Sequence, residues 1–306
     1  MIDHRETPVL MIVFNRPDRT QQVFERIRDA QPKRLYISAD GPRENRPDDR
    51  ESTLAVREFA NQVDWDCQVQ TLFRDRNLGL RIAIKTGLDW FFECEEEGII
   101  LEDDCVPDPT FFPYAAELLD RYRHDDRIAT IDGTNYLLET QKFESSYYFT
   151  KYLFVWGWAS WRRVWRDYDV QMRTWPKFRD EGRLDRVFAH PRSLRYWTRI
   201  FDQTYDETIS TWDYQFFYSQ MVNSRMSIAP ARNLISNTGW GAESTNTLNM
   251  NPEMGMATFP MEFPLKHPTF MVPDERADQF TENLCFSKPL HRKVRNRLSR
   301  VLRRLR

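Results

Sequence analysis

The chain has 306 residues, of which 41% are hydrophobic and 29% are charged, a composition that suits one large α/β domain or two modest ones and a soluble globular protein. No apolar run approaches the ~20 residues of a membrane-spanning helix, and the N-terminus lacks the basic start and apolar length of a signal peptide. Four scattered cysteines without a CxxC pair indicate neither a disulfide framework nor a zinc site, so we expect a cytoplasmic protein.

The net charge of −2 hides an uneven distribution of charge. Residues 288–306 carry nine Lys or Arg and no acid, which leaves residues 1–287 with a net charge of −11. Apolar residues recur in this tail at helical spacing, so we expect a basic amphipathic helix that lies on an anionic membrane, peripheral on the inner face of the cytoplasmic membrane. A solvated helix and a helix docked on the acidic body are the alternatives. We expect no nucleic-acid partner, because the remainder is acidic.

The first hundred residues alternate between strand and helix patterns. Strands are expected at 8–14, 34–39, 67–73 and 98–101, and helices at about 17–30, at about 50–62 and from the turn at 77–79 to about 92. This alternation predicts a parallel sheet with right-handed crossovers, whose strands all end at the same edge. We therefore expect the side chains that follow the strands to be neighbours there: Arg16, Asp40, Asn77 and residues 102–104.

The pattern loosens after residue 110. Helices are expected at 110–122 and, in two pieces broken near 209–212, at 192–224; strands are expected at 128–132 and 226–235. Residues 147–168 are crowded with aromatic side chains, and residues 251–287 show little periodicity. No internal repeat or low-complexity linker marks a domain boundary.

Three adjacent carboxylates, Glu102, Asp103 and Asp104, follow the buried strand at 98–101. Ligands of open α/β sheets bind beyond the carboxyl ends of the strands, and carboxylate oxygens suit Mg²⁺ or Mn²⁺. The alternative is a solvated turn that caps the next helix. Neither a GxxxxGK[ST] loop nor a GxGxxG is present, so a bound diphosphate would need the ion and cations such as Arg16 and Arg81.

Four short motifs, in this order, resemble the nucleotide-sugar half of GT-A glycosyltransferases: Phe14-Asn15-Arg16, Asp40-Gly41, Asn77-Leu78-Gly79 and Glu102-Asp103-Asp104. The resemblance is to family-2-like bacterial enzymes and to the N-acetylglucosaminyltransferase that begins complex N-glycans. It implies that Asp104 binds Mn²⁺ or Mg²⁺ directly. It further implies a donor site in which Glu102 and Asp103 face the ribose and sugar, Arg16 contacts the nucleotide and Asp40 the base, usually uracil, with Asn15, Asn77 and Arg81 beside them.

The second half carries two weaker resemblances. Gly157 and Trp158 resemble the segment that floors the sugar pocket, whereas most Trp residues here are better explained by core packing. Trp212 and Asp213 resemble the segment that shapes the sugar site and bears the general base of inverting enzymes. The alternative for Asp213 is a helix N-cap. Residues 237–247 resemble a lid with hinges at its glycines, or an ordinary surface loop.

The resemblance implies an α/β, GT-A-like (Rossmann-like) fold with a mostly parallel central sheet flanked by helices. Residues 1–132 would form the nucleotide-sugar-binding half, residues 133–287 the acceptor and catalytic half, and residues 288–306 a terminal helix. The implied activity is metal-dependent, inverting transfer from a UDP-sugar or other nucleotide-diphospho-sugar to a glycan or lipid-linked acceptor, in surface polysaccharide or lipopolysaccharide synthesis. A hexosyl or N-acetylhexosaminyl group would be transferred. The alternatives are a non-catalytic, membrane-associated nucleotide-sugar-binding protein and a sugar nucleotidyltransferase, which would want a glycine-rich basic loop after the first strand.

Overall fold

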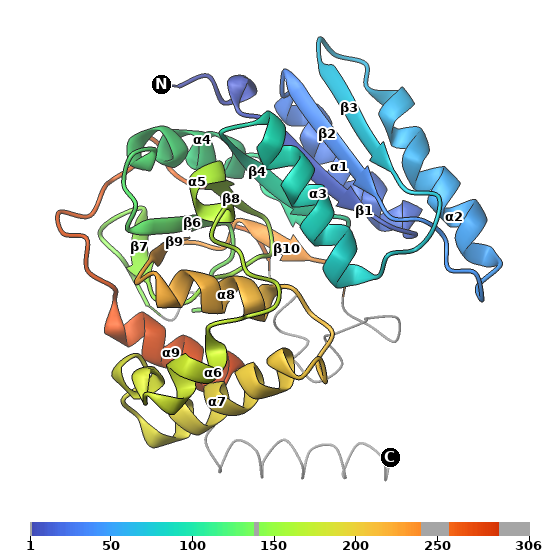
Figure 1. The fold of residues 1–306 in the computed structure, drawn as a ribbon. Helices are drawn as coiled ribbons and strands as arrows, with labels where there is room; N and C mark the ends of the chain where they lie inside the picture. The colour runs from blue at the N-terminus through green and yellow to red at the C-terminus, as the bar shows by residue number, and fades with distance from the viewer. Residues whose placement is uncertain (1, 138–140, 240–256, 288–306) are drawn as a thin grey trace, which may run out of the picture.

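A computed structural model of the chain describes residues 2–137, 141–239 and 257–287, and it consists of a large sheet with helices on both faces (Figure 1). The strands are β1 (Val9–Val13), β2 (Arg34–Ala39), β3 (Gln68–Phe73), β4 (Glu97–Glu102), β5 (Cys105–Pro107), β6 (Ile128–Asp132), β7 (Tyr147–Thr150), β8 (Trp158–Trp161), β9 (Met226–Pro230) and β10 (Ile235–Asn237). The helices are α1 (Pro17–Ala30), α2 (Asp48–Arg57), α3 (Leu80–Cys94), α4 (Phe111–Tyr122), α5 (Arg162–Trp165), α6 (Trp175–Asp180), α7 (Pro191–Tyr205), α8 (Asp213–Val222) and α9 (Glu275–Cys285). Short 3-10 turns lie at η1 (His4–Glu6), η2 (Glu58–Gln62) and η3 (Arg183–Arg186).

The first four strands form the parallel half of the sheet, in the order β3-β2-β1-β4. Val9 stands opposite Leu35 on one side and Ile99 on the other, so all the residues that follow these strands reach the same edge. The predicted strands and helices of this half are confirmed to within about two residues, and α2 continues into η2. The parallel edge was predictable because hydrophobic runs and the helices between them are local features of the sequence.

The second half of the sheet is mixed rather than parallel. β8 lies antiparallel between β4 and β6, β6 pairs in parallel with β9, and β7 is antiparallel to β9 at the edge. The sheet as a whole is still mostly parallel, as expected, because four of its seven strand pairings are parallel. The sequence did not predict β8, which lies in the aromatic stretch. Both faces of this strand are buried, so it lacks the alternation of polar and apolar residues that marks a half-exposed strand.

Helix α9 is also absent from the sequence prediction. Its N-cap is Asp274, whose carboxylate accepts hydrogen bonds from the backbone of Arg276 and Ala277 at 3.0 and 2.9 Å. The predicted strand at 226–235 is wrong in its second part, because β9 ends at Pro230. The predicted terminal helix at 288–306 and most of the predicted lid lie outside the described residues.

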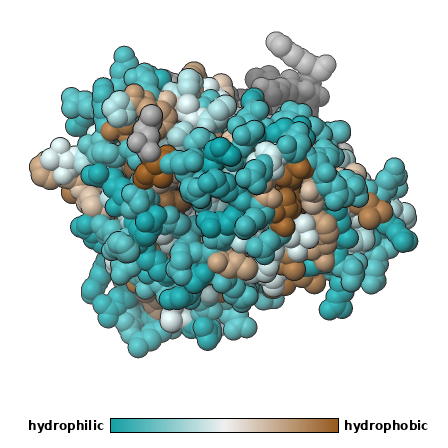
Figure 2. Space-filling view, turned by 90° about the horizontal axis from the view of Figure 1, so that it is seen from above, coloured by the Kyte–Doolittle hydropathy of each residue, from teal (hydrophilic) through white to brown (hydrophobic). Residues whose placement is uncertain are grey.

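The described residues form two large hydrophobic clusters and a small third one. The larger one surrounds the sheet, and a second, mostly aromatic cluster lies among α6, α7, α8 and the end of α9. Figure 1 shows α6, α7 and α9 grouped on the far side of α8 from the sheet. Figure 2 shows a face on which hydrophilic residues predominate and hydrophobic ones form small separate patches. No helix among the described residues is long and apolar enough to cross a membrane.

Candidate active site

A sharp corner of the chain carries the three adjacent acids. β4 ends at Glu102, Asp103 and Asp104 form the turn, and β5 then leaves to pair with β10. The backbone N–H of Thr238 donates to the carbonyl of Asp104 at 2.8 Å, which fixes the end of β10 against the turn. A Cβ atom added to Gly239 would lie 2.1 Å from the Asp104 Oδ2, so a larger residue there would push the Asp104 carboxylate out of its present position.

Arg16 supplies the positive charge that the acid corner requires. Its Nη1 lies 3.3 Å from the Asp103 Oδ1 and 3.0 Å from the Asp104 Oδ2. Burial, followed by the negative charge of Asp104, raises the pKa of Asp103 above its ordinary value, and Arg16 opposes this rise. Burial also holds the pKa of Glu102 well above its usual range, with the two neighbouring acids adding to the effect. The contact between the ends of β1 and β4 is the one that the sequence predicted.

Asp40 organises the neighbouring part of the same edge. Its carboxylate accepts hydrogen bonds from the backbone N–H of Gly41 and Leu78, at 2.8 and 2.9 Å, and from the Nδ2 of Asn77 at 2.9 Å. The N–H of Gly79, whose φ of +78° favours glycine, adds a fourth bond at 3.2 Å. The predicted meeting of Asp40 and Asn77 is confirmed, and it ties the loop after β2 to the start of α3.

Asn15 has a partner that sequence reasoning did not identify. Its Nδ2 donates to Asp49 at 2.7 Å, and the guanidinium of Arg43 binds the same carboxylate while it lies 5.3 Å from the centre of the Phe14 ring. The hydrogen bonds from Arg43 are the main cause that lowers the pKa of Asp49 to about 2. The bond from Asn15 adds to this effect, and burial opposes it. Asp49 was missed because it lies among several other acids at the start of α2.

Arg81 lies in the first turn of α3 and links the two halves of the chain. Its Nη2 lies 3.0 Å from the carboxylate of Glu207, which follows α7. The partner is 69% exposed, so the ion pair holds Arg81 only weakly.

Gly157 and Trp158 lie at the start of β8, and Trp212 lies at the start of α8. Gly157 has a φ of +59°, and a Cβ atom there would lie 2.4 Å from the side chain of Ile235. The indole rings of Trp158 and Trp212 are stacked with centroids 6.0 Å apart, and their exposed fractions are 0% and 4%. The structure therefore places Trp158 in the core, where it supports Trp212, rather than on a surface that a donor could touch.

Asp213 begins α8, and Trp212 occupies the N-cap position. The N-cap alternative for Asp213 is therefore wrong. The hydroxyl of Thr211 donates to its carboxylate, while burial raises the pKa of Asp213 above the ordinary value. The negative charge of Asp213 also adds to the raised pKa of Glu102, so this carboxylate of the second half lies in the neighbourhood of the acid corner.

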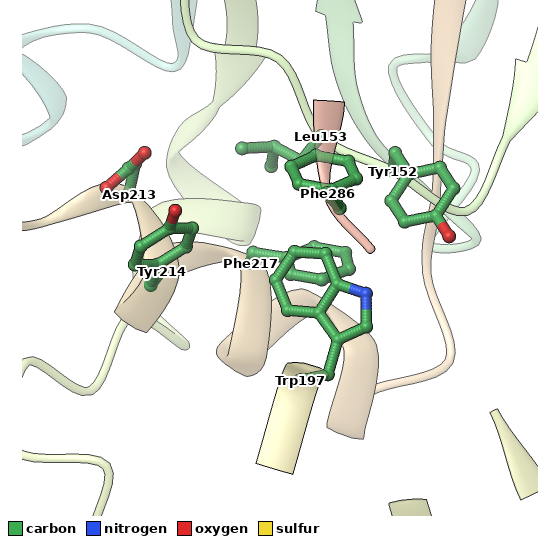
Figure 3. Close-up of a pocket in the computed structure, with 7 residues that line it drawn as sticks. All are labelled: Tyr152, Leu153, Trp197, Asp213, Tyr214, Phe217 and Phe286. Carbon is green, nitrogen blue, oxygen red and sulfur yellow. The ribbon is translucent and has the colours of Figure 1, made fainter. Parts of the chain in front are cut away.

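Asp213 also borders a small pocket of about 40 Å³. The other residues that line it come from α7, α8, the loop after β7 and the end of α9: Tyr152, Leu153, Trp197, Tyr214, Phe217 and Phe286 (Figure 3). Six of the seven lining side chains are aromatic or aliphatic, so Asp213 stands at the border between a charged corner and an apolar recess.

Residues 9–178 match the sequence profile of glycosyl transferase family 2, more than half of the chain. The chain belongs to glycosyl transferase family 2. No curated protein matches this glycosyltransferase. The match ends before Asp213, so it includes the acid corner and leaves the aromatic pocket largely outside. It confirms the GT-A fold and the use of a nucleotide sugar that the four motifs predicted.

Solved structures resemble this glycosyltransferase only distantly. A mannosyltransferase from Pyrobaculum calidifontis in complex with GDP-Man and Mn²⁺ is 15% identical, with a TM-score of 0.38, over 53% of this chain and 46% of that chain. A cytidylyltransferase from Leptospira borgpetersenii is 12% identical, with a TM-score of 0.34, over 54% and 63% of the two chains. A UDP-glucose pyrophosphorylase complexed with UDP-glucose has 11% identity and a TM-score of 0.34, over 53% and 78%. This glycosyltransferase spans less than two thirds of the first two proteins, and at these scores none carries an argument about function.

The donor set of the acid corner fits a divalent cation only in part. Asp103 and Asp104 direct oxygens at one positively charged nitrogen of Arg16, which is the arrangement that a cation bound by two carboxylates needs. Within the described ranges, no group of three His, Cys, Asp or Glu residues is placed to hold a metal ion. Mg²⁺ and Mn²⁺ sites of nucleotide enzymes commonly use one or two carboxylates, with phosphate oxygens and water as the other ligands.

Proposed function

We propose that this family 2 enzyme is a metal-dependent, inverting glycosyltransferase that moves a hexosyl or N-acetylhexosaminyl group from a UDP-sugar. The observation that carries the proposal is the acid corner, where Asp103 and Asp104 converge on one cationic nitrogen of Arg16 at the edge of the sheet. The carboxylate of Asp213, at the start of α8, lies near enough for its charge to add to the raised pKa of Glu102. A cation site with a carboxylate base in its neighbourhood meets the needs of an inverting transfer.

The parallel edge of the sheet holds the donor in this proposal. Asp104 is the direct ligand of Mn²⁺ or Mg²⁺, and the ion would neutralise charge on the departing diphosphate. Glu102 and Asp103 contact the ribose and the donor sugar. The remaining donor contacts come from the edge described above: Asn15, Arg16, Asp40, Asn77 and Arg81. Gly157 and Trp212 form the floor beneath the sugar, and Trp158 supports Trp212 from the core.

Asp213 is the general base. Its carboxylate takes the proton of an acceptor hydroxyl as that oxygen bonds to the anomeric carbon, while the bond from that carbon to the diphosphate oxygen breaks. Attack from the face opposite the leaving group inverts the anomeric configuration. Burial raises the pKa of Asp213, which makes the carboxylate a stronger base, and the Thr211 hydroxyl favours the ionised form.

The acceptor is a glycan or a lipid-linked glycan of surface polysaccharide or lipopolysaccharide synthesis, and the basic residues at 288–306 bring the enzyme to an anionic membrane. Co-sedimentation with liposomes that contain anionic lipid tests the membrane contact. The full chain should pellet, and a chain that ends at residue 287 should stay in solution. Equal pelleting of both chains would contradict the membrane proposal and leave the enzymatic one intact.

Thermal-shift titration with nucleotide sugars, with and without Mn²⁺, tests the donor site. A UDP-sugar at 100 times its Kd should stabilise the protein by about 2.7 kcal/mol, and only when Mn²⁺ is present. Asp104→Asn should lose this shift, whereas Asp213→Asn should keep it and lose transfer. A protein that binds UDP-sugar and Mn²⁺ without turnover would be the non-catalytic alternative, and no response to any nucleotide sugar would overturn the proposal.

A further inference from the structure

The pocket beside Asp213 is assembled from segments that are far apart in the sequence. Tyr152 and Leu153 follow β7, Trp197 lies on α7, and Phe286 follows α9. Figure 3 shows these side chains around one space, with the Asp213 carboxylate at its edge. The recess therefore adjoins the group that would deprotonate an acceptor.

Two of the aromatic side chains that line the pocket, Tyr152 and Trp197, carry polar atoms that are hydrogen-bonded to a residue outside it. The hydroxyl of Tyr152 and the indole Nε1 of Trp197 both donate to the Oε2 of Glu282, the latter at 3.2 Å. Glu282 is buried on α9 and is not among the residues that line the pocket. Because one carboxylate holds both polar atoms, the two rings turn apolar surfaces towards the space.

Tyr214 is the third polar aromatic residue that lines the pocket, and Tyr196 lies beside its hydroxyl. Leu153, Phe217 and Phe286 have no polar side-chain atom. The remaining polar side chain that lines the pocket is Asp213, whose carboxylate accepts a hydrogen bond from the hydroxyl of Thr211. The pocket therefore suits an apolar group, and the ligand atoms next to that group would contact the carboxylate of Asp213.

The size of the recess limits what it can hold. A dry cavity of about 150 Å³ accepts a benzene ring. The pocket beside Asp213 measures about 40 Å³, so it has room for a small substituent and not for a sugar ring.

We propose that this pocket binds a methyl group of the acceptor sugar, carried either by an N-acetyl group or by the 6-position of a 6-deoxy sugar. The inference rests on the proposed function, because Asp213 must act as the base. The methyl group enters the apolar recess, and a hydroxyl on the adjoining part of the same sugar lies against the Asp213 carboxylate. The pocket thus selects the acceptor and orients the hydroxyl that attacks.

Binding of simple glycosides tests the methyl preference. In the presence of UDP and Mn²⁺, methyl N-acetylglucosaminide and N-acetylgalactosaminide are compared with methyl glucoside and galactoside, and methyl fucoside and rhamnoside with their 6-hydroxy parents. Affinities come from NMR titration, and saturation transfer shows whether the ligand methyl group touches the protein. One of the two classes should bind about 10-fold more tightly than its methyl-free partner, with the strongest transfer at its methyl group. Equal binding within every pair would overturn the inference.

Filling the pocket separates this site from other binding surfaces. Leu153→Trp should remove the methyl preference, while Leu54→Trp, a matched change at an exposed position of α2, should leave it intact. Leu153→Phe fills less space and serves if the larger residue prevents folding, which circular dichroism reports. A preference that survives in a folded filling variant would overturn the inference.

The failure of the inference and that of the proposed function give different results. If UDP-sugar and Mn²⁺ stabilise the protein but no methyl preference exists, only the acceptor pocket is wrong. If no nucleotide sugar stabilises the protein in any condition, the proposed function is wrong as well.

Discussion

The acid corner and the aromatic pocket are the two sides of the proposed active site, and they are built in opposite ways. The acid corner is formed by short loops after neighbouring parallel strands, and it concentrates charge: Asp103 and Asp104 face Arg16 at 3.3 and 3.0 Å. The pocket is formed by segments from residue 152 to residue 286, and its polar groups are bound behind its wall. One side is suited to an ion and a diphosphate, the other to an apolar group of an acceptor.

This contrast places Asp213 in an intermediate environment. The aromatic side removes water from Asp213, and burial is the largest cause of its raised pKa, while the hydroxyl of Thr211 opposes the rise. A carboxylate that is poorly solvated but still ionised is a better base than one in water. The difference between the two regions therefore provides what a general base needs, and the following changes test it.

Replacement of Asp213 should have the largest effect. Asp213→Asn removes the base and should lower kcat by about 10²–10⁴-fold, while the donor affinity stays within about twofold. In the unmodified enzyme, kcat should fall as the pH drops through the raised pKa of Asp213, because the protonated carboxyl cannot accept a proton. Steady-state kinetics across pH measures both effects.

Asp206→Asn is the matched control, because Asp206 is exposed at the end of α7, and it should change neither parameter. Near-normal turnover of Asp213→Asn would exclude this residue as the base.

Replacement of Trp197 should show how much the aromatic cluster around the pocket contributes to the free energy of unfolding. Trp197 is 1% exposed and packs against the rings of Phe188, Phe217 and Phe286, so Trp197→Ala should cost about 3–5 kcal/mol in the free energy of unfolding. Urea denaturation measures the loss. Tyr205→Ala on the same helix, at an exposed position, should cost less than about 0.5 kcal/mol. Similar losses in the two variants would show that the aromatic cluster contributes little to stability.

Asp278 should make the stability of the pocket side depend on pH. Burial, opposed by the Thr150 hydroxyl, raises the pKa of Asp278 to about 6. The folded protein then binds a proton that the unfolded chain releases near pH 4, so stability should fall by about 1–3 kcal/mol as the pH rises through 6. Asp278→Asn keeps an acceptor for Thr150 and should flatten this dependence, which denaturation at pH 5 and pH 8 measures.

The control for this pH dependence is Asp180→Asn, at an exposed position of α6, which should leave the slope unchanged. An unchanged slope in Asp278→Asn would show that another group titrates.

Replacement of Asp49 should have the smallest effect on stability, and the pH dependence that Asp49 causes should have the opposite sign to that of Asp278. Hydrogen bonds from Arg43 lower the pKa of Asp49 to about 2, so its contribution is present at neutral pH and is lost as the pH falls from about 4 through 2. The Arg43 side chain is 43% exposed, and solvent screening limits this contribution to about 0.5–1 kcal/mol. Asp49→Asn should cost this amount at pH 7 and less at pH 3 in urea denaturation. An equal loss at both pH values would mean that the charge of Asp49 is not what stabilises the loop.

The parallel half shows how far sequence reasoning reaches. The contacts of Arg16 with Asp103 and Asp104, and of Asp40 with Asn77, follow from a rule about strand ends that needs no knowledge of packing. Asn15 was placed on the correct edge, but its partner Asp49 was missed because one acid among several carries no distinguishing signal.

By itself, the sequence determined the alternating first half, the edge on which its polar residues gather and the corner of three acids. These depend on local periodicity and on a geometry that all parallel strands share. Only the tertiary structure decided the mixed second half of the sheet, the burial of Trp158, and the aromatic pocket beside Asp213. Each of these depends on contacts between distant residues, such as those of Glu282 with Tyr152 and Trp197, and no local pattern encodes such contacts.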